Sequence, residues 1–273
     1  MSPVLTIAGQ EIRDGLRDRW VVAATVLMAV LALSLVLMGS APAGNVKTSP
    51  LAVAVVSLAS LSIFLVPLIA LLLSHDAIVG ETERGTILLL LSYPVARWQL
   101  LTGKFLGQMA IITFATVLGY GVAGLAVEAM SADGGGAGRL AFLVLLASSI
   151  ALGAVFVGFG YLISVSVRER GTAAGLAVAV WLVFVVLYDT ALLGVLVTAD
   201  IPAWALNTLL LLNPADVYRL LNLTGFEEVR YLSGMAGLSV KAGLGGAALV
   251  GALLAWLAVP LAIAAARFGR REL

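Results

Sequence analysis

The sequence has little charge. Only 11% of its 273 residues are Asp, Glu, Lys or Arg, whereas 62% are hydrophobic. Soluble domains average about 25% charged and about 45–50% apolar residues, so this composition excludes a soluble enzyme. The formal net charge of +1 leaves no basic field that could attract nucleic acid. The composition therefore predicts an integral membrane protein with a lipid bilayer, and not nucleic acid, as its environment.

Cysteine is absent, and histidine occurs once, as His75. The absence of cysteine excludes disulfides, thiolate metal sites and cysteine nucleophiles. One histidine alone makes a poor metal site, so an interfacial or capping role is favoured for His75. The six methionines are scattered, and they offer no row of thioether ligands for a soft metal. We therefore expect no metal site, no bound cofactor and no catalytic residue in this chain.

Long uncharged hydrophobic runs dominate the sequence. A helix needs about 20 apolar residues to cross about 30 Å of hydrocarbon. Runs of this length predict six transmembrane helices, near residues 20–39, 51–74, 105–127, 140–167, 172–198 and 243–266. The first run lacks a small-residue cleavage site, which favours a retained span over a signal peptide. The sequence thus predicts an all-α integral membrane fold, with residues 1–273 as a single transmembrane domain.

The distribution of Lys and Arg predicts the orientation. Six spans place both termini on the same side of the membrane. Eleven of the sixteen basic residues lie in the terminal segments and in the second and fourth loops, and five lie on the opposite side. Because positive residues concentrate in cytoplasmic segments, we expect both the N- and the C-terminus to be cytoplasmic.

Residues 2–19 have the pattern of an amphipathic helix. Leu5, Ala8, Ile12 and Leu16 recur at helical spacing on one stripe, and charged residues occupy the other face. A helix of this kind lies in the membrane interface. The alternative is a solvated segment before the first span, and the stripe favours the interfacial helix.

Residues 75–104 form a long connection between the second and third predicted spans. At about 30 residues, this segment exceeds a simple helix–helix connection. Charged residues between two glycines lead into an apolar run at 87–91, which Pro94 ends. A short helix with one charged end suits docking on another protein at the membrane surface. An interfacial helix without a partner has the same composition, so both interpretations stay open.

Residues 199–243 form a long outer loop that is too apolar to be merely exposed. Asn213, Pro214 and Asp216 have the pattern of a helix start, and Tyr218 and Arg219 follow them. The apolar stretch that precedes Asn213 is too short to cross a bilayer. We therefore expect short re-entrant helices that dip into the outer leaflet.

Asp189 is the one acidic residue inside a predicted span. An intramembrane carboxylate is a candidate functional group, because its charge is unfavourable in hydrocarbon. About 16 residues into its helix, it lies roughly 24 Å from the start, in the outer third. It either holds the outer loop in place, through backbone hydrogen bonds or an ion pair with Arg219, or serves as a substrate or proton site.

One segment carries the resemblance to a known family. Residues 79–97 read Val-Gly-Glu-Thr-Glu-Arg-Gly-Thr-Ile-Leu-Leu-Leu-Leu-Ser-Tyr-Pro-Val-Ala-Arg. This stretch is similar to the coupling-helix region of ABC-2-type permeases, with its acidic pair, Gly-Thr, leucines and Ser-x-Pro-x-x-Arg. The chain therefore resembles an ABC-2 permease of the type V exporter-like fold. The resemblance implies that the ATPase-coupling residues are Glu81, Glu83, Arg84, Gly85, Thr86 and Arg97.

Residues 11–20 and 211–219 extend the resemblance to permeases that serve maturation of nitrous oxide reductase and its copper–sulfur centre. It implies a homodimer in the bacterial inner membrane and two copies of a separate ATPase that binds ATP and Mg²⁺. It also implies a periplasmic β-helical partner that rests on the outer loop at Asn213, Pro214, Asp216, Tyr218 and Arg219. The sequence agrees that nucleotide binds elsewhere, since a phosphate-binding loop needs Gly-x-x-x-x-Gly-Lys. Gly103-Lys104 is preceded at the required position by Trp98. A scaffold that transmits motion without moving a solute, and a generic exporter of lipid or drug, remain alternatives.

Overall fold

The computed structural model describes residues 2–39, 50–87, 92, 95–130, 136–198, 201–223 and 244–270. Within these residues every regular element is a helix, and no strand occurs. Six helical stretches in this part of the chain are long and apolar enough to cross a membrane. The predicted all-α fold with six membrane-length helices is therefore confirmed, while the orientation of the termini stays a prediction.

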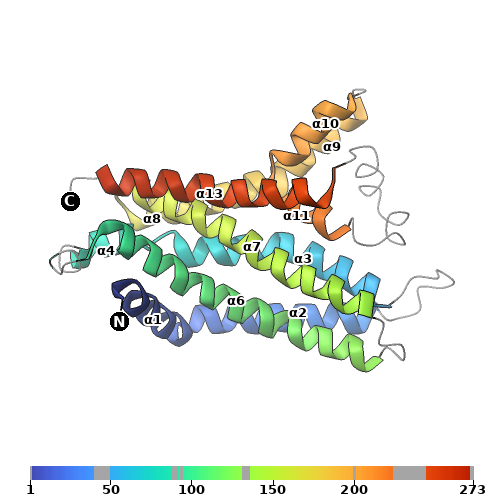
Figure 1. Cartoon of the computed structure of the whole chain (residues 1–273), viewed down its shortest axis with the longest axis horizontal. Helices are drawn as coiled ribbons and strands as arrows, with labels where there is room; N and C mark the ends of the chain where they lie inside the picture. Colours follow the sequence, from blue (N-terminus) through green and yellow to red (C-terminus); the bar gives the residue numbers. More distant parts are fainter. Residues whose placement is uncertain are drawn as a thin grey trace.

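The six membrane-length stretches follow the hydrophobic runs. They are α2 (Arg19–Gly39), α3 (Pro50–Ser74), α6 (Arg97–Met130), α7 (Gly136–Ser166), the continuous stretch of α8 (Arg170–Leu182), η1 (Val183–Leu187) and α9 (Tyr188–Thr198), and α13 (Gly246–Arg270). Prolines lie inside α3 and α13, as membrane helices tolerate where neighbouring groups can satisfy the freed backbone. Most of these helices run along the long axis of the molecule (Figure 1).

Four shorter helices complete the described chain. They are α1 (Pro3–Arg17), α4 (Val79–Glu83), α10 (Ala203–Leu211) and α11 (Pro214–Leu223). Figure 1 shows α1, α4, the start of α8 and the end of α13 at one end of the bundle, and α11 toward the other. Helices α10 and α11, which lie within the segment 199–243, are too short to cross a bilayer. The residues 224–243 of that predicted segment lie outside the described residues, as do residues 88–91 of the apolar run after α4.

Helix α6 begins earlier than the third predicted span. Its 34 residues start at Arg97, whereas the apolar run starts at 105. At about 1.5 Å per residue the helix is about 51 Å long, which exceeds the hydrocarbon thickness. The first turns of α6 therefore extend beyond the apolar run, and residues 97–104 are helical and not part of a loop.

Glycines allow α1 to approach these first turns of α6 closely. A Cβ atom at Gly103 would lie 2.8 Å from the Cβ of Ile7, and one at Gly107 would lie 2.5 Å from the Cβ of Glu11. Ala8 of α1 is buried, whereas Leu5 is 58% exposed. Helix α1 thus packs one face on α6 and leaves apolar side chains free for a lipid interface.

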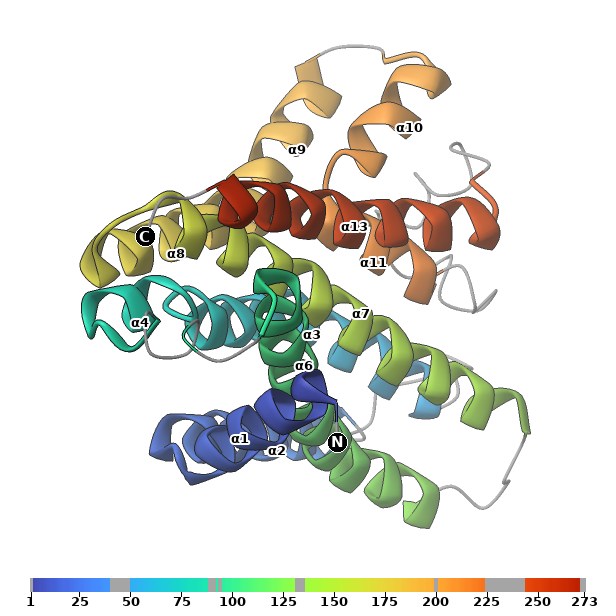
Figure 2. The same ribbon diagram turned by 60° about the vertical axis from the view of Figure 1, so that its left-hand side comes forward.

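The fifth predicted span is not a uniform α-helix. Residues 183–187 form a turn of π-helix between α8 and α9, and a π-bulge inserts a residue and redirects the helix that follows. Beyond it, α9 and α10 project together away from the other helices (Figure 2). The hydrophobic run gave no signal for this change, because it contains neither Gly nor Pro at that point.

Candidate functional site

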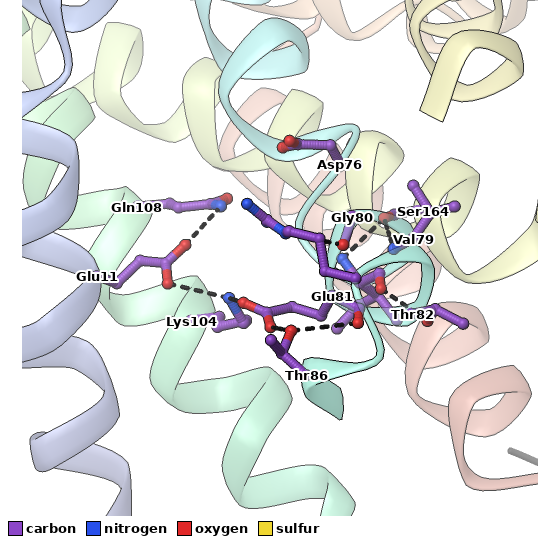
Figure 3. A network of polar contacts seen from close by, with 12 residues as sticks. Glu11, Asp76, Val79, Gly80, Glu81, Thr82, Thr86, Lys104, Gln108 and Ser164 are labelled. Atoms are coloured by element: carbon purple, nitrogen blue, oxygen red, sulfur yellow. Dashed lines mark hydrogen bonds and ion pairs between the residues drawn. The ribbon is translucent and has the colours of Figure 1, made fainter. Parts of the chain in front are cut away.

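Helix α4 is fixed to α7 through its first backbone groups. The backbone N–H groups of Ile78 and Val79 donate to Ser164 Oγ at 2.9 and 3.0 Å. The first N–H groups of a helix lack partners inside the helix, and this buried hydroxyl accepts two of them. Ser164 is fully buried, so the start of α4 is anchored inside the bundle (Figure 3).

Glu81 of α4 joins a charged network that centres on Lys104 of α6. Lys104 Nζ lies 3.4 Å from Glu81 Oε1 and 3.1 Å from Glu11 Oε2. Gln108 Nε2 also donates to Glu11 Oε1, at 3.2 Å, and to the carbonyl oxygen of Leu73, at 3.3 Å. A single lysine thereby connects α1, α4 and α6 (Figure 3).

Arg84, Gly85 and Thr86 of the predicted coupling segment form the C-terminal end of α4 and the turn after it. Gly85 has a φ of +71°, a left-handed conformation that suits glycine just after a helix. Thr86 donates to the Glu81 carboxylate, and Arg84 Nε donates to the carbonyl oxygen of Gly80 at 3.0 Å. Glu83 and Arg84 are exposed, so they are the charged groups of α4 that another protein can reach.

One ion pair and one hydrogen bond tie this segment to α8. Arg170 Nη2 lies 2.6 Å from Asp76 Oδ2, and the backbone N–H of Arg170 donates to Glu83 Oε1 at 2.7 Å. A carboxylate at the first N–H groups of a helix also faces the positive end of its dipole. The start of α8 is therefore held by residues on both sides of α4.

Arg97 contacts the end of α13. Its Nη1 donates to the carbonyl oxygens of Phe268 and Gly269 at 3.0 and 3.1 Å, and its guanidinium lies 5.9 Å from the Phe268 ring centroid. The last carbonyl groups of a helix lack partners within the helix. Arg97 thus caps the end of α13.

Asp189 pairs with Arg219 toward the other end of the bundle. Arg219 Nη2 lies 2.5 Å from Asp189 Oδ2, and its Nη1 lies 2.7 Å from Asp216 Oδ1. Burial raises the pKa of Asp216 above its ordinary value, the Asp189 charge acts in the same direction, and Arg219 opposes both. One guanidinium therefore serves two carboxylates, one on α9 and one on α11.

Asn213 connects the start of α11 to the π-helical turn. Its Oδ1 accepts the backbone N–H of Ala215 at 3.0 Å, which makes it a helix cap. Its Nδ2 donates to the carbonyl oxygen of Phe184 at 3.0 Å and to Asp216 Oδ2 at 3.1 Å. The predicted helix start therefore also satisfies a carbonyl group of η1.

Tyr218 enters a buried chain of hydroxyl groups. Its OH is hydrogen-bonded to Ser149 Oγ at 2.9 Å, Ser149 to Ser62 at 3.3 Å, and Ser62 to the OH of Tyr120 at 2.6 Å. Ser148 and Asn222 add a second contact between α7 and α11 at 2.9 Å. This chain links α3, α6, α7 and α11 inside the bundle.

The outer residues predicted to face a partner are largely buried. Asn213, Asp216 and Tyr218 are at most 1% exposed, and Pro214 is also buried. Their polar groups are satisfied within the chain, so in this structure they position α11 and do not form an exposed surface. On the neighbouring α10, Trp204 is 73% exposed.

Sequence reasoning missed the internal partners of the coupling segment, namely Glu11, Asp76, Lys104, Gln108, Ser164 and Arg170. An acidic residue on the amphipathic first helix and a lysine just before an apolar run were visible signals, but their pairing depends on how α1 packs on α6. The described residues contain no group of three or more His, Cys, Asp or Glu side chains that could hold a metal ion.

Six membrane-length helical stretches in the described residues define a multi-pass membrane protein, with short helices packed at both ends of the bundle. Residues 5–273 match the family model of ABC-2 family transporter proteins, and the chain belongs to this family. It is 45% identical over 275 residues to the probable ABC transporter permease protein NosY of Stutzerimonas stutzeri, covering 99% of both chains. It is also 45% identical over 276 residues to the protein of the same name from Pseudomonas aeruginosa, covering both chains completely.

Proposed function

We propose that this ABC-2 family permease couples ATP hydrolysis by a separate NosF-like ATPase to events across the bacterial inner membrane. Those events serve maturation of the copper–sulfur centre of nitrous oxide reductase. The similarity to NosY permeases over the whole chain supports this assignment. The single structural observation that carries the coupling role is the anchoring of α4 by Ser164 and Lys104.

The anchoring of α4 has a mechanical consequence. Its start is bonded to α7, Glu81 is bonded to α6, and Glu83 contacts the start of α8. A displacement applied to its exposed side is therefore passed to three membrane-length helices. We place the ATPase contact on Glu83 and Arg84, because these two residues of the segment are exposed and can be reached from outside the bundle.

Helix α8 offers the route outward. It starts at the Asp76–Arg170 pair and continues through η1 to Asp189, which pairs with Arg219 of α11. On this proposal, motion at the cytoplasmic end reaches the outer segment 201–223. There a periplasmic NosD-like β-helical protein would receive it.

The proposed assembly contains two copies of this chain and two copies of the ATPase, with both termini of each permease in the cytoplasm. ATP and Mg²⁺ bind in the ATPase, because this sequence lacks the Gly-x-x-x-x-Gly-Lys pattern of a phosphate-binding loop.

The docking assignment is tested with Glu83→Ala in the full complex. We expect the variant to weaken stimulation of the ATPase by the permease at least severalfold, since Glu83 is an exposed charge of α4. Asp14→Asn is the matched control, because it removes an exposed acid from α1 at the same end of the bundle. Equal ATPase stimulation in Glu83→Ala and wild type would refute the docking surface.

Transport and mechanical signalling are separated by a second experiment. The complete complex is reconstituted in liposomes, and ATP-dependent movement of copper ions and of sulfur-containing solutes is measured. The scattered methionines favour signalling over copper transport, because soft-metal transport needs clustered sulfur ligands. A reproducible ATP-dependent substrate would overturn the signalling interpretation. A parallel assay with a fluorescent lipid and a drug tests the generic exporter, which ATP-dependent movement of these compounds alone would favour.

A further inference from the structure

A cavity of about 330 Å³ lies where α7 and α13 end. Its lining residues are Val165, Ser166, Val167, Arg168, Arg267 and Arg270. Three of the six are arginines, and none of the described lining residues is acidic. None of these residues belongs to the coupling network or to the Asp189 cluster.

The charge of this cavity is not neutralised by the described chain. Arg267 Nη1 donates to Ser166 Oγ at 2.7 Å, which holds this guanidinium against the end of α7. Within residues 2–39, 50–87, 95–130, 136–198, 201–223 and 244–270, neither Arg168 nor Arg270 has an ion pair. Glu169, the acidic neighbour of Arg168, pairs with neither of them. Three guanidinium groups around one space favour an anion, and their fork of N–H donors matches a phosphate group.

An exposed apolar stripe leads to the cavity along α13. Val259 is 53% exposed and Ile263 is 41% exposed, and they precede Arg267 by eight and four residues. Residues four apart lie on the same helix face. Helix α13 is one of the six membrane-length stretches, so this stripe runs along the hydrocarbon and ends at the basic cavity. A ligand that is anionic at one end and apolar along its length fits both parts.

We infer that this cavity binds the phosphate group of an anionic phospholipid. Arg168, Arg267 and Arg270 hold the headgroup phosphate, and the acyl chain follows Val259 and Ile263. Basic pockets at the ends of transmembrane helices are suited to anionic headgroups. The apolar stripe favours a lipid over a soluble phosphate, which has nothing to place against Val259, and over an acidic protein surface, which would not reach hydrocarbon depth.

The test uses the full chain, purified and delipidated in detergent. Binding of a phosphatidylglycerol, of a phosphatidylcholine with the same acyl chains, and of inorganic phosphate is measured by native mass spectrometry and by titration. The variant is Arg267→Gln with Arg270→Gln. The control is Arg13→Gln with Arg17→Gln, which removes two exposed positive charges from α1 at the same end of the bundle.

We expect wild type and control to prefer phosphatidylglycerol over phosphatidylcholine, and the cavity variant to lose about fivefold in affinity for each arginine removed. Because both arginines are exposed, the variant is expected to fold, and size-exclusion chromatography verifies this. An equal loss in the α1 control would overturn the site in favour of general surface attraction. Inorganic phosphate that binds as tightly as phosphatidylglycerol would overturn the lipid assignment. Lipid binding by the cavity variant that equals that of wild type would overturn the proposed site.

Discussion

Lys104 is the residue whose removal should disturb the coupling segment most. Its side chain is 8% exposed, and its ammonium group is shared by Glu11 and Glu81. Lys104→Met preserves the aliphatic stem but leaves two carboxylates facing each other without a positive charge. Breaking a buried ion pair in this way costs about 3–5 kcal/mol, because the remaining charge is uncompensated.

Partial exposure of the two carboxylates makes the expected loss of stability smaller. The Glu11 and Glu81 side chains are 22% and 20% exposed, so water partly screens the carboxylates that remain. We therefore expect Lys104→Met to lower the free energy of unfolding by about 2–3 kcal/mol, below the loss for a fully buried pair. Unfolding in mixed micelles, followed by tryptophan fluorescence, measures the change.

A compensated variant makes the test specific to charge. Adding Glu11→Gln and Glu81→Gln to Lys104→Met removes all three charges, so most of the lost stability should return. A Lys104→Met variant as stable as wild type would show that the network contributes little. A triple variant as unstable as Lys104→Met would show that packing around the lysine stem, and not charge, is responsible.

Three further predictions follow from the same structure. Arg219→Gln should lower the free energy of unfolding by about 2–4 kcal/mol in mixed micelles, because two carboxylates lose their shared partner. Adding Asp189→Asn should restore part of this stability, and no recovery would contradict the pairing. Tyr218→Phe should cost about 1 kcal/mol in the same assay, since it removes one buried hydrogen bond, and a loss near zero would contradict that role. Gly107→Ala should shift α1 and lower the melting temperature. Gly121→Ala is the control and should not, because nothing lies within 4 Å of its new Cβ. Equal melting temperatures of the two variants would refute the close α1–α6 contact.

The membrane-length helices could be predicted because bilayer thickness fixes the length of an apolar run. Hydropathy also misplaced the start of α6, since Arg97 and Lys104 make its first turns too polar for a spanning segment. Helix α1 packs against these first turns at Gly103 and Gly107. Only the tertiary arrangement of α1 and α6 contains that information.

The charged part of the candidate site could be predicted, whereas its hydroxyl groups could not. The charged residues of α4 were visible as a pattern, and Arg219 was one of the partners considered for Asp189. The hydroxyl chain from Ser62 to Tyr218 was not, because serines and tyrosines disturb hydropathy little and no spacing rule joins α3, α6, α7 and α11. The π-helical turn could not be predicted either, since the residue that donates to its carbonyl group, Asn213, lies outside that helix in the sequence.

Helix α8 differs from the other membrane-length helices in how it is held. In its most apolar stretch, 11% of the residues of α8, η1 and α9 are buried, against 50% for α7. Polar contacts hold it at Arg170 and at Asp189, and between them Trp181 Nε1 donates to the carbonyl oxygen of Phe64 at 2.9 Å. Phe184 also packs against Phe159 and Trp256. A shift of this helix therefore disturbs a few contacts and not a whole core. Because helices inside a close-packed core resist small displacements, we infer that α8, and not α7, carries motion between α4 and α11.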